Sequence, residues 1–564
     1  MLLINPAHER FGGILSRYIP VGIPVALGVL AAYLRKWGVK DIHVIDEEIE
    51  QITPENFSRL MNNINKNEPL IVGITVLTSQ AGRAYKIARL LKETFSDCTI
   101  IMGNVHVTTL PAEPLEMGVA DIVVRGEGEE TLRKLYFALR DGSEWKDIKG
   151  ITYIDDNGEL VSTPDNDLIE NLDDVPMFPY ELFENPRYDM GFLTGARGCP
   201  YKCTYCSQRL LTGFTYRWHS TDRIIENLSL LINKYGQKNI TFYDDIFSVN
   251  KRRVIDLCEG IVKAGLHKKC GFAVQTRADN VHEDLLPYMK KANFLTVGMG
   301  METGVERIAE ECQKEQTVAQ HLEAVRLCKK YGLKVSLFMI YGFPGESKED
   351  REETFRVIQE SKVGYVKFNN LIPYPGTPIY QRAQNEGKLH IADGWLNFNS
   401  TLSITRSIFD TTPLPYVPEG VTEYELKRDI IRRNLQYYFR WKIVTSILMR
   451  DKGVGWIALP PNWFMKPREI GALTGMAIVL AGNLLFSLLP VSLGNKIFAR
   501  FKHGESQKAP EDIKVNQRKF KRKKAPVMDS IPAKPADAQT VDVTETSGEH
   551  ESGRTPWLQW SAPK

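Results

Sequence analysis

Short apolar, β-branched runs alternate with helical patterns over the first 385 residues of this chain. Such alternation is typical of parallel sheets whose strands are joined by crossover helices. It predicts two successive series, in residues 1–150 and 191–385, joined by a connector at 151–190 that is rich in Asp, Asn and Pro. Ligands bind such sheets at the carboxyl ends of the strands, so we expect functional residues in the loops that follow the strands.

The strands expected in the first series form a doubly wound, Rossmann-like parallel sheet: Leu2–Asn5, Ile42–Asp46, Leu70–Thr75, Thr99–Met102 and Asp121–Val124. Those expected in the second series form a partial or complete (β/α) barrel: Phe192–Gly195, Ile240–Tyr243, Gly271–Gln275, Thr296–Met301, Lys334–Ile340 and Val366–Asn370. Residues 386–465 are expected to form a helical C-terminal region. In the first series, a hydroxyl-rich loop after Thr75 and a loop that begins with Gly103 and Asn104 are candidate binding loops.

The overall composition is that of a globular protein. With 43% hydrophobic and 25% charged residues among 564, it excludes wholesale disorder and a protein that crosses a membrane many times. The net charge of +3 does not favour nucleic acid as a partner. From Lys496 to the end there are 14 Lys and Arg against 9 Asp and Glu, so the tail is basic and the body is nearly neutral.

An uncharged, largely apolar segment lies near the C-terminus, from Ile470 to Asn495. About 20 such residues suffice to cross a bilayer, so we expect residues 466–502 to contact a membrane as a spanning or re-entrant helix or as an interfacial hairpin. A buried core or oligomer helix is the alternative. Residues 503–564 are expected to be a basic, disordered tail. Its run Arg518–Lys524 predicts a cytoplasmic protein attached to the cytoplasmic face of the membrane, unless the tail is merely solvated.

Three of the eight cysteines lie within eight residues, at Cys199, Cys203 and Cys206, directly after the first expected strand of the second series. Three thiolates this close in one loop can hold a metal centre together. Structural zinc sites need four ligands, and the sequence has no fourth cysteine or flanking histidine nearby. Iron–sulfur clusters use similar spacings, and a set of three leaves one iron open. The spacing therefore favours an iron–sulfur cluster, with zinc and coincidence as alternatives.

The spacing, with the aromatic Tyr205 before the last cysteine, resembles the signature of the radical S-adenosylmethionine (SAM) enzymes. The resemblance implies a [4Fe-4S] cluster on Cys199, Cys203 and Cys206, whose fourth iron chelates SAM. It also implies that one electron, from a donor such as flavodoxin or ferredoxin, cleaves SAM to a 5′-deoxyadenosyl radical. In that family the radical abstracts hydrogen from an unactivated carbon, so the resemblance implies an enzyme.

Later strand ends, up to about residue 385, are similar to the SAM-binding elements of this family. The resemblance implies that their polar and turn residues contact the cofactor together with Tyr205: Asp244 and Asp245 after the second strand, Gln275 and Arg277 at the third, Glu302 at the fourth, and Gly342 and Pro344 at the fifth. For Arg277 or Glu302 taken alone, a structural ion pair is the alternative interpretation.

The first series resembles the cobalamin-binding domain that one large radical SAM subfamily carries. The resemblance rests on Pro20–Gly22, on Gly103 with Asn104, and on the run Asp121–Glu129. It implies cobalamin at the carboxyl edge of the sheet, contacted by Thr75, Thr78, Gly103, Asn104, Gly126 and Glu127. The chain lacks the Asp-x-His-x-x-Gly motif that supplies an axial histidine in mutases, and His8 is only a near match. Cobalamin therefore binds without a protein histidine, or the domain has lost corrin binding.

The expected function is cobalamin-dependent radical SAM methylation of a small molecule, with a lipid-like or isoprenoid substrate favoured by the apolar C-terminal segment. Radical oxidative cyclisation or oxygenation of a tetrapyrrole or lipid, without methyl transfer, is the alternative. A methylthiotransferase is disfavoured, because such enzymes carry three N-terminal cysteines and only Cys98 precedes Cys199 here. A non-enzymatic, membrane-tethered metal-binding protein is the distant alternative.

Overall fold

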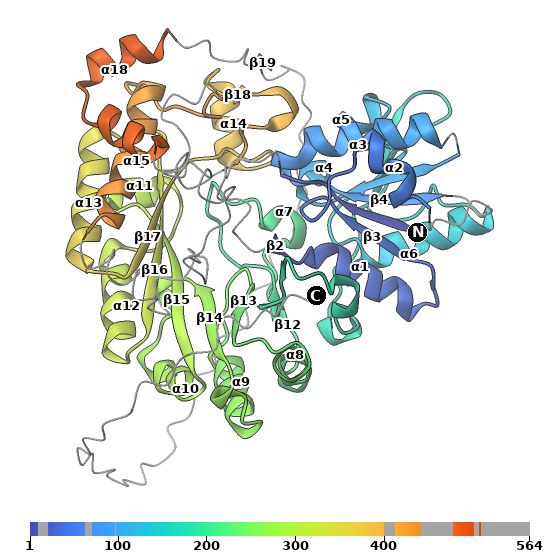
Figure 1. Cartoon of the computed structure of the whole chain (residues 1–564), viewed down its shortest axis with the longest axis horizontal. Helices are drawn as coiled ribbons and strands as arrows, with labels where there is room; N and C mark the ends of the chain where they lie inside the picture. Colours follow the sequence, from blue (N-terminus) through green and yellow to red (C-terminus); the bar gives the residue numbers. More distant parts are fainter. Residues whose placement is uncertain are drawn as a thin grey trace, which may run out of the picture.

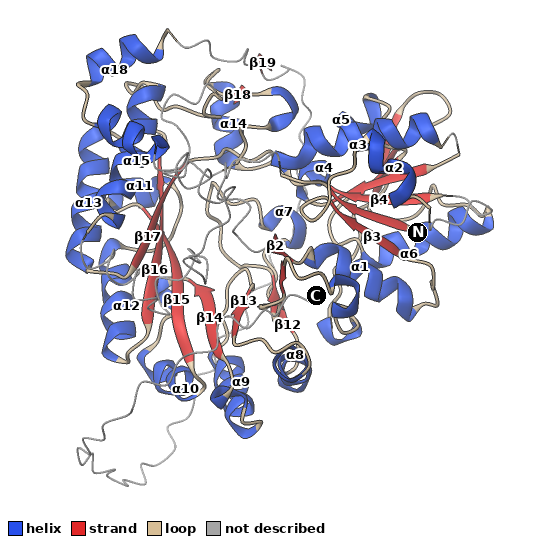
Figure 2. Ribbon diagram, viewed as in Figure 1, coloured by secondary structure: helices blue, strands red, loops and turns tan. Residues whose placement is uncertain are grey.

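Two sheets, each with its own helices, make up most of the protein (Figures 1 and 2). The computed structural model describes residues 1–8, 21–62, 70–95, 97–399, 412–440, 478–500 and 507–508. In Figure 1 the sheet that contains the N-terminus lies on the right and the second sheet lies on the left.

The first sheet has seven strands within the described residues. In order across the sheet they are β3 (His43–Asp46), β1 (Leu2–Asn5), β4 (Ile71–Thr75), β5 (Thr99–Gly103), β6 (Ile122–Val124), β7 (Ile151–Ile154) and β8 (Leu160–Ser162). The first five pair in parallel, which confirms the predicted parallel sheet. The last two pair antiparallel and lie in residues that the sequence analysis assigned to the connector.

Both faces of this sheet are buried, because successive side chains of a strand point to opposite faces. On β1, Leu2 and Ile4 pack in one hydrophobic core and Leu3 packs in another. The helices of this region are α1 (Val25–Lys36), α2 (Pro54–Leu60), α3 (Ala81–Thr94), α4 (Val105–Thr109), α5 (Ala112–Glu116) and α6 (Glu129–Asp141). With both faces covered, the strand ends and their loops remain for ligand binding.

The second sheet is an open, partial (β/α) barrel, as predicted. Its six parallel strands are, in order, β10 (Phe192–Leu193), β13 (Asn239–Phe242), β14 (Gly271–Thr276), β15 (Phe294–Glu302), β16 (Lys334–Tyr341) and β17 (Tyr365–Asn370). The accompanying helices are α7 (Arg209–Thr212), α8 (Thr221–Asn233), α9 (Lys251–Lys263), α10 (Leu286–Lys291), α11 (Glu306–Glu311), α12 (Val318–Lys330), α13 (Lys348–Ser361) and α14 (Pro378–Asn385). Two short pairs complete the region: β2 (Val21–Gly22) with β9 (Tyr188–Asp189), and β11 (Ala196–Arg197) with β12 (Arg217–Trp218).

Local sequence signals determine where the barrel helices begin. At α12, the Thr317 hydroxyl accepts a hydrogen bond from the Gln320 amide, while the Gln320 side chain accepts one from the Thr317 amide. Ser347 and Asp350 form the same reciprocal pair at α13. These capping boxes satisfy backbone donors that the first helical turn leaves free. Both helices therefore start at a defined residue after the loop that follows a strand.

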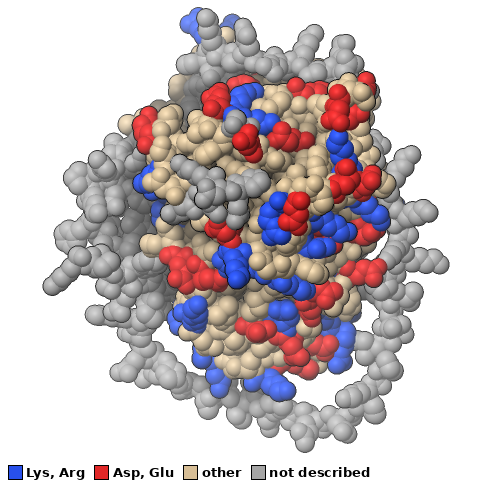
Figure 3. Space-filling model, turned by 90° about the vertical axis from the view of Figure 1, so that its right-hand side faces the viewer, with Lys and Arg blue, Asp and Glu red and all other residues tan. Residues whose placement is uncertain are grey.

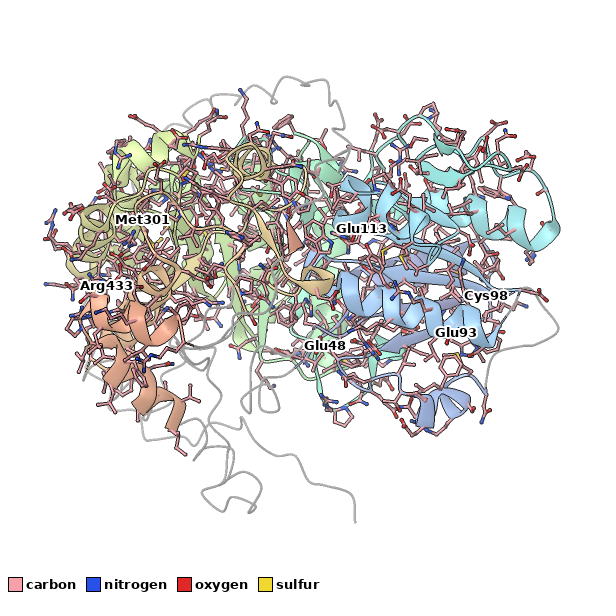
Figure 4. All side chains as sticks on the ribbon, turned by 90° about the horizontal axis from the view of Figure 1, so that it is seen from above. Glu48, Glu93, Cys98, Glu113, Met301 and Arg433 are labelled. Atoms are coloured by element: carbon pink, nitrogen blue, oxygen red, sulfur yellow. The ribbon has the colours of Figure 1, made fainter. Side chains whose placement is uncertain are left out.

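The two sheets share a hydrophobic core where their helical coverings meet. Residues of α3, α4 and α5 pack there with Tyr380 of α14 and with Trp395. The Trp395 indole donates a hydrogen bond of 2.8 Å to Glu113, which Figure 4 shows between the two regions. His106 is fully buried beside them, 3.3 Å from the Glu113 carboxylate. This shared packing holds the N-terminal region against the barrel.

The C-terminal helices pack at the edge of the barrel. Helix α15 (Glu423–Tyr438) lies along β17, where the Asn434 side chain exchanges two hydrogen bonds with the Phe368 backbone. A helical stretch at residues 478–487 and α18 (Val491–Phe498) pack on α15. A short pair forms between β18 (His390–Ile391) and β19 (Gln507–Lys508).

No helix within the described residues is long and apolar enough to cross a membrane. Of the expected membrane segment, residues 466–477 and 501–502 lie outside the described part of the chain, as does most of the expected disordered tail at 503–564. The described helical residues 478–487 extend only about 15 Å at 1.5 Å per residue, against a hydrocarbon core of about 30 Å. A turn then separates them from α18. The spanning helix predicted for 466–502 is therefore not supported within the described residues, where 478–487 and α18 are separate helical stretches.

Acidic and basic side chains are interspersed on the face shown in Figure 3, which lies on the side of the N-terminal region. Proteins that bind nucleic acid present a basic stripe or patch. This face carries no such area.

Candidate functional site

The three clustered cysteines lie in the loop after β11. Gly198, just before them, has φ 92°, and a Cβ at this position would lie 2.0 Å from the Thr215 carbonyl oxygen. Only glycine fits there, because other residues clash and rarely adopt this φ. Inside the loop, the Thr204 amide donates to the Cys312 carbonyl at the end of α11 (2.9 Å). The loop is thus held at both ends, and its cysteines are half-buried and free of disulfides.

These cysteines fit a cluster of irons better than a single ion. Among the described residues, no three Cys, His, Asp or Glu side chains are arranged around one metal position. A [4Fe-4S] cluster does not need that arrangement, because each thiolate binds a different iron. Burial raises the pKa of Cys199 to about 12 and that of Cys206 to about 11, and the neighbouring cysteines add to both shifts. The cluster irons and any nearby cation would favour the thiolates.

Arg277, after β14, supplies such a charge. Its Nη1 donates to the Cys203 Sγ at 3.8 Å, and its guanidinium lies 3.5 Å from the centre of the Tyr201 ring. Asp279 accepts hydrogen bonds from Nε and Nη2 (3.1 and 3.0 Å), and the Lys314 carbonyl accepts another (2.8 Å). Arg277 thus forms the ion pair that the sequence analysis gave as the alternative interpretation. Its guanidinium also points at Cys203, one of the expected cluster ligands.

A buried polar network connects the cysteine loop to β15. The Tyr205 hydroxyl donates to Glu302 Oε1 (3.0 Å), and Lys314 Nζ donates to the same oxygen (2.9 Å) and to the Tyr205 oxygen (3.1 Å). Burial alone would lower the pKa of Lys314, but the Glu302 carboxylate outweighs it and the pKa is raised. Lys314 is therefore a buried cation. Sequence reasoning missed it, because no motif marks a lysine in the loop after α11.

The two aspartates after β13 support the cysteine loop from below. Asp244 accepts from the Gly195 amide (2.6 Å) and forms a buried ion pair with Arg253 (2.9 Å), which fix the position of its carboxylate. Asp245 accepts from the Gly198 amide (2.7 Å), next to the first cluster ligand. Burial raises the pKa of Asp245 to about 6. Of the pair, Asp245 is the one that faces open space.

The turn after β16 packs against the same loop. Gly342 has φ 96°, and its amide donates to the buried Glu346 carboxylate (2.6 Å). The Phe343 ring meets the Tyr205 ring edge to face at 5.8 Å, and Pro344 is buried in the same turn. Gln275 lies on the same strand end as Arg277, two residues before it, and its side chain is exposed. The contacts described above join Tyr205, Asp245, Arg277, Glu302 and the Gly342 turn to the cysteine loop.

A cavity of about 300 Å³ lies between the carboxyl edge of the first sheet and the residues that surround the cysteine loop. Five of the six residues expected to contact cobalamin line it: Thr75, Gly103, Asn104, Gly126 and Glu127. Barrel residues form the facing wall: Thr194, Arg197, Gln208, Tyr243 and Asp245. Thr78, the sixth expected residue, is buried in the turn after β4 and is not among the lining residues.

The wall formed by the first sheet suits a large, flat ligand. Asn104 adopts φ 89°, and its side chain donates to the Thr75 hydroxyl (2.8 Å). Gly126 has φ 78°, and its amide donates to the Thr108 hydroxyl (3.1 Å). These hydrogen bonds hold the polar side chains against the edge of the sheet, so a ring system can approach the backbone. The residues present therefore fit cobalamin.

The described residues that line this cavity include no histidine. His8, the near match in the sequence, lies instead 3.1 Å from Glu48 and 3.4 Å from the Gln80 side chain. The lining thus favours the interpretation in which cobalamin binds without a protein histidine.

Ion pairs close the boundary between the two sheets. Arg217 donates to both carboxylate oxygens of Glu127 (2.7 and 2.9 Å), and Arg197 donates to Glu129 (2.7 Å). Burial alone would raise the pKa of Glu127, but Arg217 and Arg197 outweigh it and lower the pKa. Glu127 is therefore a bridge between the sheets as well as a cavity residue. Sequence reasoning missed both arginines, because only the β11–β12 pair brings them to the first sheet.

Comparison with known proteins agrees with both halves of this site. The Radical SAM superfamily model matches residues 193–358, and the B12 binding domain model matches residues 14–136. An uncharacterized methyltransferase of Pyrococcus horikoshii is 36% identical over 389 residues, which are 68% of this chain and 82% of that protein.

Two other curated relatives carry more specific names. The anaerobic magnesium-protoporphyrin IX monomethyl ester cyclase of Cereibacter sphaeroides is 26% identical over 68% of this chain and 64% of its own. The hopanoid C-2 methylase of Rhodopseudomonas palustris is 30% identical over 38% of this chain and 42% of its own.

Among solved structures, the cobalamin-dependent S-adenosylmethionine radical enzyme OxsB with aqua-cobalamin bound has a TM-score of 0.61 to this chain. The match covers 86% of this chain and 80% of that one at 17% identity, so it shows a shared fold. Together with the cysteine loop and the shared cavity, these findings identify the chain as a member of the radical SAM superfamily, an enzyme that carries a B12-binding domain and uses a [4Fe-4S] cluster, SAM and cobalamin.

Proposed function

We propose that this enzyme transfers a methyl group to an unactivated carbon of a lipid-like or isoprenoid substrate. The observation that carries the proposal is the cavity lined by both sheets, because it joins the cobalamin wall to Asp245, which holds the start of the cluster loop. When bound, the cluster and SAM supply the radical that activates the carbon, and cobalamin supplies the methyl group. A substrate in this cavity would lie between the cobalamin wall and the start of the cluster loop.

The chain's own residues position these groups and balance their charge. Arg277 and Lys314 place two cations near the thiolate ligands. Lys314 also fixes the oxygens of Glu302 and Tyr205, which then face the SAM site in one orientation. Asp245 holds the start of the loop through the Gly198 amide. Such preorganisation lets the site accept charged cofactors without rearrangement.

The proposed substrate class is apolar. The aliphatic first-sheet wall of the cavity is assigned to cobalamin rather than to the substrate, and its residues are Leu3, Val25, Leu27, Val29, Leu30, Ile101, Val124 and Leu132. The name of the hopanoid methylase supports the same class, and the apolar C-terminal helices give such a substrate a route from a membrane.

The test is an anaerobic assay with reconstituted enzyme, hydroxocobalamin, dithionite or reduced flavodoxin, and SAM carrying a deuterated methyl group. Lipid extracts serve as the substrate pool, and products are analysed by mass. We expect a lipid that gains one labelled methyl group, with 5′-deoxyadenosine and S-adenosylhomocysteine formed together. Labelling confined to a water-soluble acceptor would contradict the lipid-like substrate.

Radical cyclisation or oxygenation without methyl transfer is the second candidate. It is favoured by the cyclase relative, which matches 68% of this chain. The same assay distinguishes the two reactions, because cyclisation produces 5′-deoxyadenosine with a product that has lost hydrogen or gained oxygen and carries no label. Reduced flavodoxin and ferredoxin, supplied in place of dithionite, test the proposed electron donors.

A further inference from the structure

The C-terminal helix pair, residues 478–498, is fixed to the barrel through α15. The Tyr424 hydroxyl donates to the Phe486 carbonyl (3.0 Å), and Arg428 Nε donates to the Ser487 carbonyl (3.0 Å). Gly494 packs directly on the Tyr424 ring, where a Cβ would lie 2.1 Å from ring carbons. The orientation of the pair on the protein is therefore defined.

The outward face of this pair is apolar and its inward face contains polar groups. Asn483 and Ser487 are buried at 1% exposure, together with the hydrophobic residues that contact α15. Large aliphatic side chains point outward instead and are 45–67% exposed: Ile478, Leu484, Leu485, Leu488 and Leu493. A surface helix of a globular protein has the opposite arrangement. Exposed apolar side chains gathered in this way mark an interaction surface.

The charges around this face have one sign. Residues 470–504 contain no Asp or Glu, and their bases are Lys496, Arg500 and Lys502. Lys496 and Arg500 are exposed at the end of α18, next to the aliphatic face. An apolar face with a basic border is complementary to a bilayer that contains anionic phospholipid. A second copy of the chain fits less well, because a symmetric contact would bring two sets of like charges together.

We propose that the C-terminal helix pair docks in the plane of an anionic phospholipid membrane, with Leu484, Leu485 and Leu488 inserted between the lipids. The docked face lies beside the functional edge of the barrel. The opposite, inward face of the pair packs on the start of α15, where Leu426 meets the Gly342 turn that follows β16. In Figure 1, α18 lies at the end of the molecule towards which β16 and β17 run. Docking therefore turns the mouth of the barrel towards the lipid.

The experiment is vesicle flotation of the full-length holoenzyme, with vesicles of phosphatidylcholine alone and with added phosphatidylglycerol. It is run at low salt and at about 1 M salt, where the screening length is about 3 Å and attraction by the basic tail is suppressed. We expect binding that needs phosphatidylglycerol at low salt, with a residual fraction at high salt that depends on the leucines.

The triple variant Leu484→Glu, Leu485→Glu, Leu488→Glu should lose at least tenfold in binding and all of the residual fraction at high salt. The matched control is Ile154→Glu with Leu160→Glu, because these side chains are also apolar and exposed (38% and 43%) but lie on the β7–β8 hairpin. The control should bind like the wild type. Lys496→Glu with Arg500→Glu should weaken binding at low salt by about fivefold or more for each base.

Folding of each variant is checked by its melting temperature and by 5′-deoxyadenosine formation, neither of which the proposal changes. Vesicle binding that survives in a folded triple variant overturns the proposal. A dimer that the leucine substitutions dissociate, in a protein that does not float with vesicles, also overturns it. Neither result bears on methyl transfer, which is read separately from the labelled product.

Discussion

The carboxyl edges of the two sheets face the same cavity but differ in chemistry. The barrel edge is crowded with buried charge, since Arg277, Lys314 and Glu302 lie beside the cysteine loop and interact with its residues. The edge of the first sheet presents glycines, hydroxyls and the Asn104 amide above a largely aliphatic wall.

This difference suits the ligands that we propose for the two edges. A cluster with thiolate ligands and a zwitterionic cofactor need fixed charges, and fixed charges need buried partners to be stable. A large ring system needs a backbone that it can approach closely and few competing charges. Glu127 and Glu129, paired with Arg197 and Arg217, place charge on the boundary between the two edges.

The largest expected effect comes from Cys203→Ala. Two thiolates cannot hold the cubane, so the brown absorbance of the cluster and SAM cleavage should both fall to background. Cobalamin retention, read from its visible spectrum, should stay near the wild-type level because it belongs to the other edge. A variant that keeps its iron and its turnover contradicts the assignment of the ligands.

Lys314→Met should have the second-largest effect. It leaves the Glu302 carboxylate buried without its cation, which costs about 3–5 kcal/mol of unfolding free energy. SAM affinity, measured by equilibrium binding, should fall with it, whereas Lys314→Arg should recover much of both. If the methionine variant bound SAM normally, the charge network would be structural only.

Glu346→Gln tests the buried charge of the barrel edge through pH. Burial raises the pKa of Glu346 to about 8 from an ordinary 4.5, so the folded protein binds this proton more tightly than the unfolded one. Stability should therefore fall as pH rises from about 4.5 to 8, by up to about 5 kcal/mol in the wild type. In the Glu346→Gln variant this loss of stability with rising pH should disappear. The control variant Glu349→Gln, which changes an exposed residue of α13, should keep it.

Arg217→Met breaks the bridge between the edges. It removes two hydrogen bonds from Glu127 and should cost about 1–3 kcal/mol. A double-mutant cycle with Glu127→Gln in thermal unfolding measures the coupling. Additive effects would show that the two residues do not join the sheets energetically.

Asn104→Ala should have the smallest effect. At φ 89° an alanine is strained by about 1–2 kcal/mol, whereas Asn104→Gly is not. Both variants lose the hydrogen bond to Thr75 and should retain less cobalamin with an intact cluster. Equal cobalamin occupancy in all three proteins would remove Asn104 from the binding wall.

Prediction from the sequence succeeded where the signal was periodic or a fixed spacing. The strands of both sheets begin and end within two residues of the predicted bounds, because alternating apolar runs report burial directly. The hairpin β7–β8 was missed: three of the four β7 residues are buried, but its partner β8 has three residues, is largely exposed and shows no such pattern. The membrane-spanning interpretation is not supported by the described residues for a related reason: apolar length alone cannot show that the chain turns at residues 488–490.

The sequence itself indicates the three cysteines, the order of the strands along the chain and the glycines at the strand ends, because each depends on residues close together in the chain. The side chains that contact these residues cannot be identified in this way. Lys314 reaches Tyr205 across 109 positions and Arg217 reaches Glu127 across 90, through loops whose paths only the packed sheets define. The sequence thus determined which groups can carry the chemistry. Tertiary packing decided which charged side chains stabilise those groups. The physical reason is that a charge needs a partner only when folding buries it.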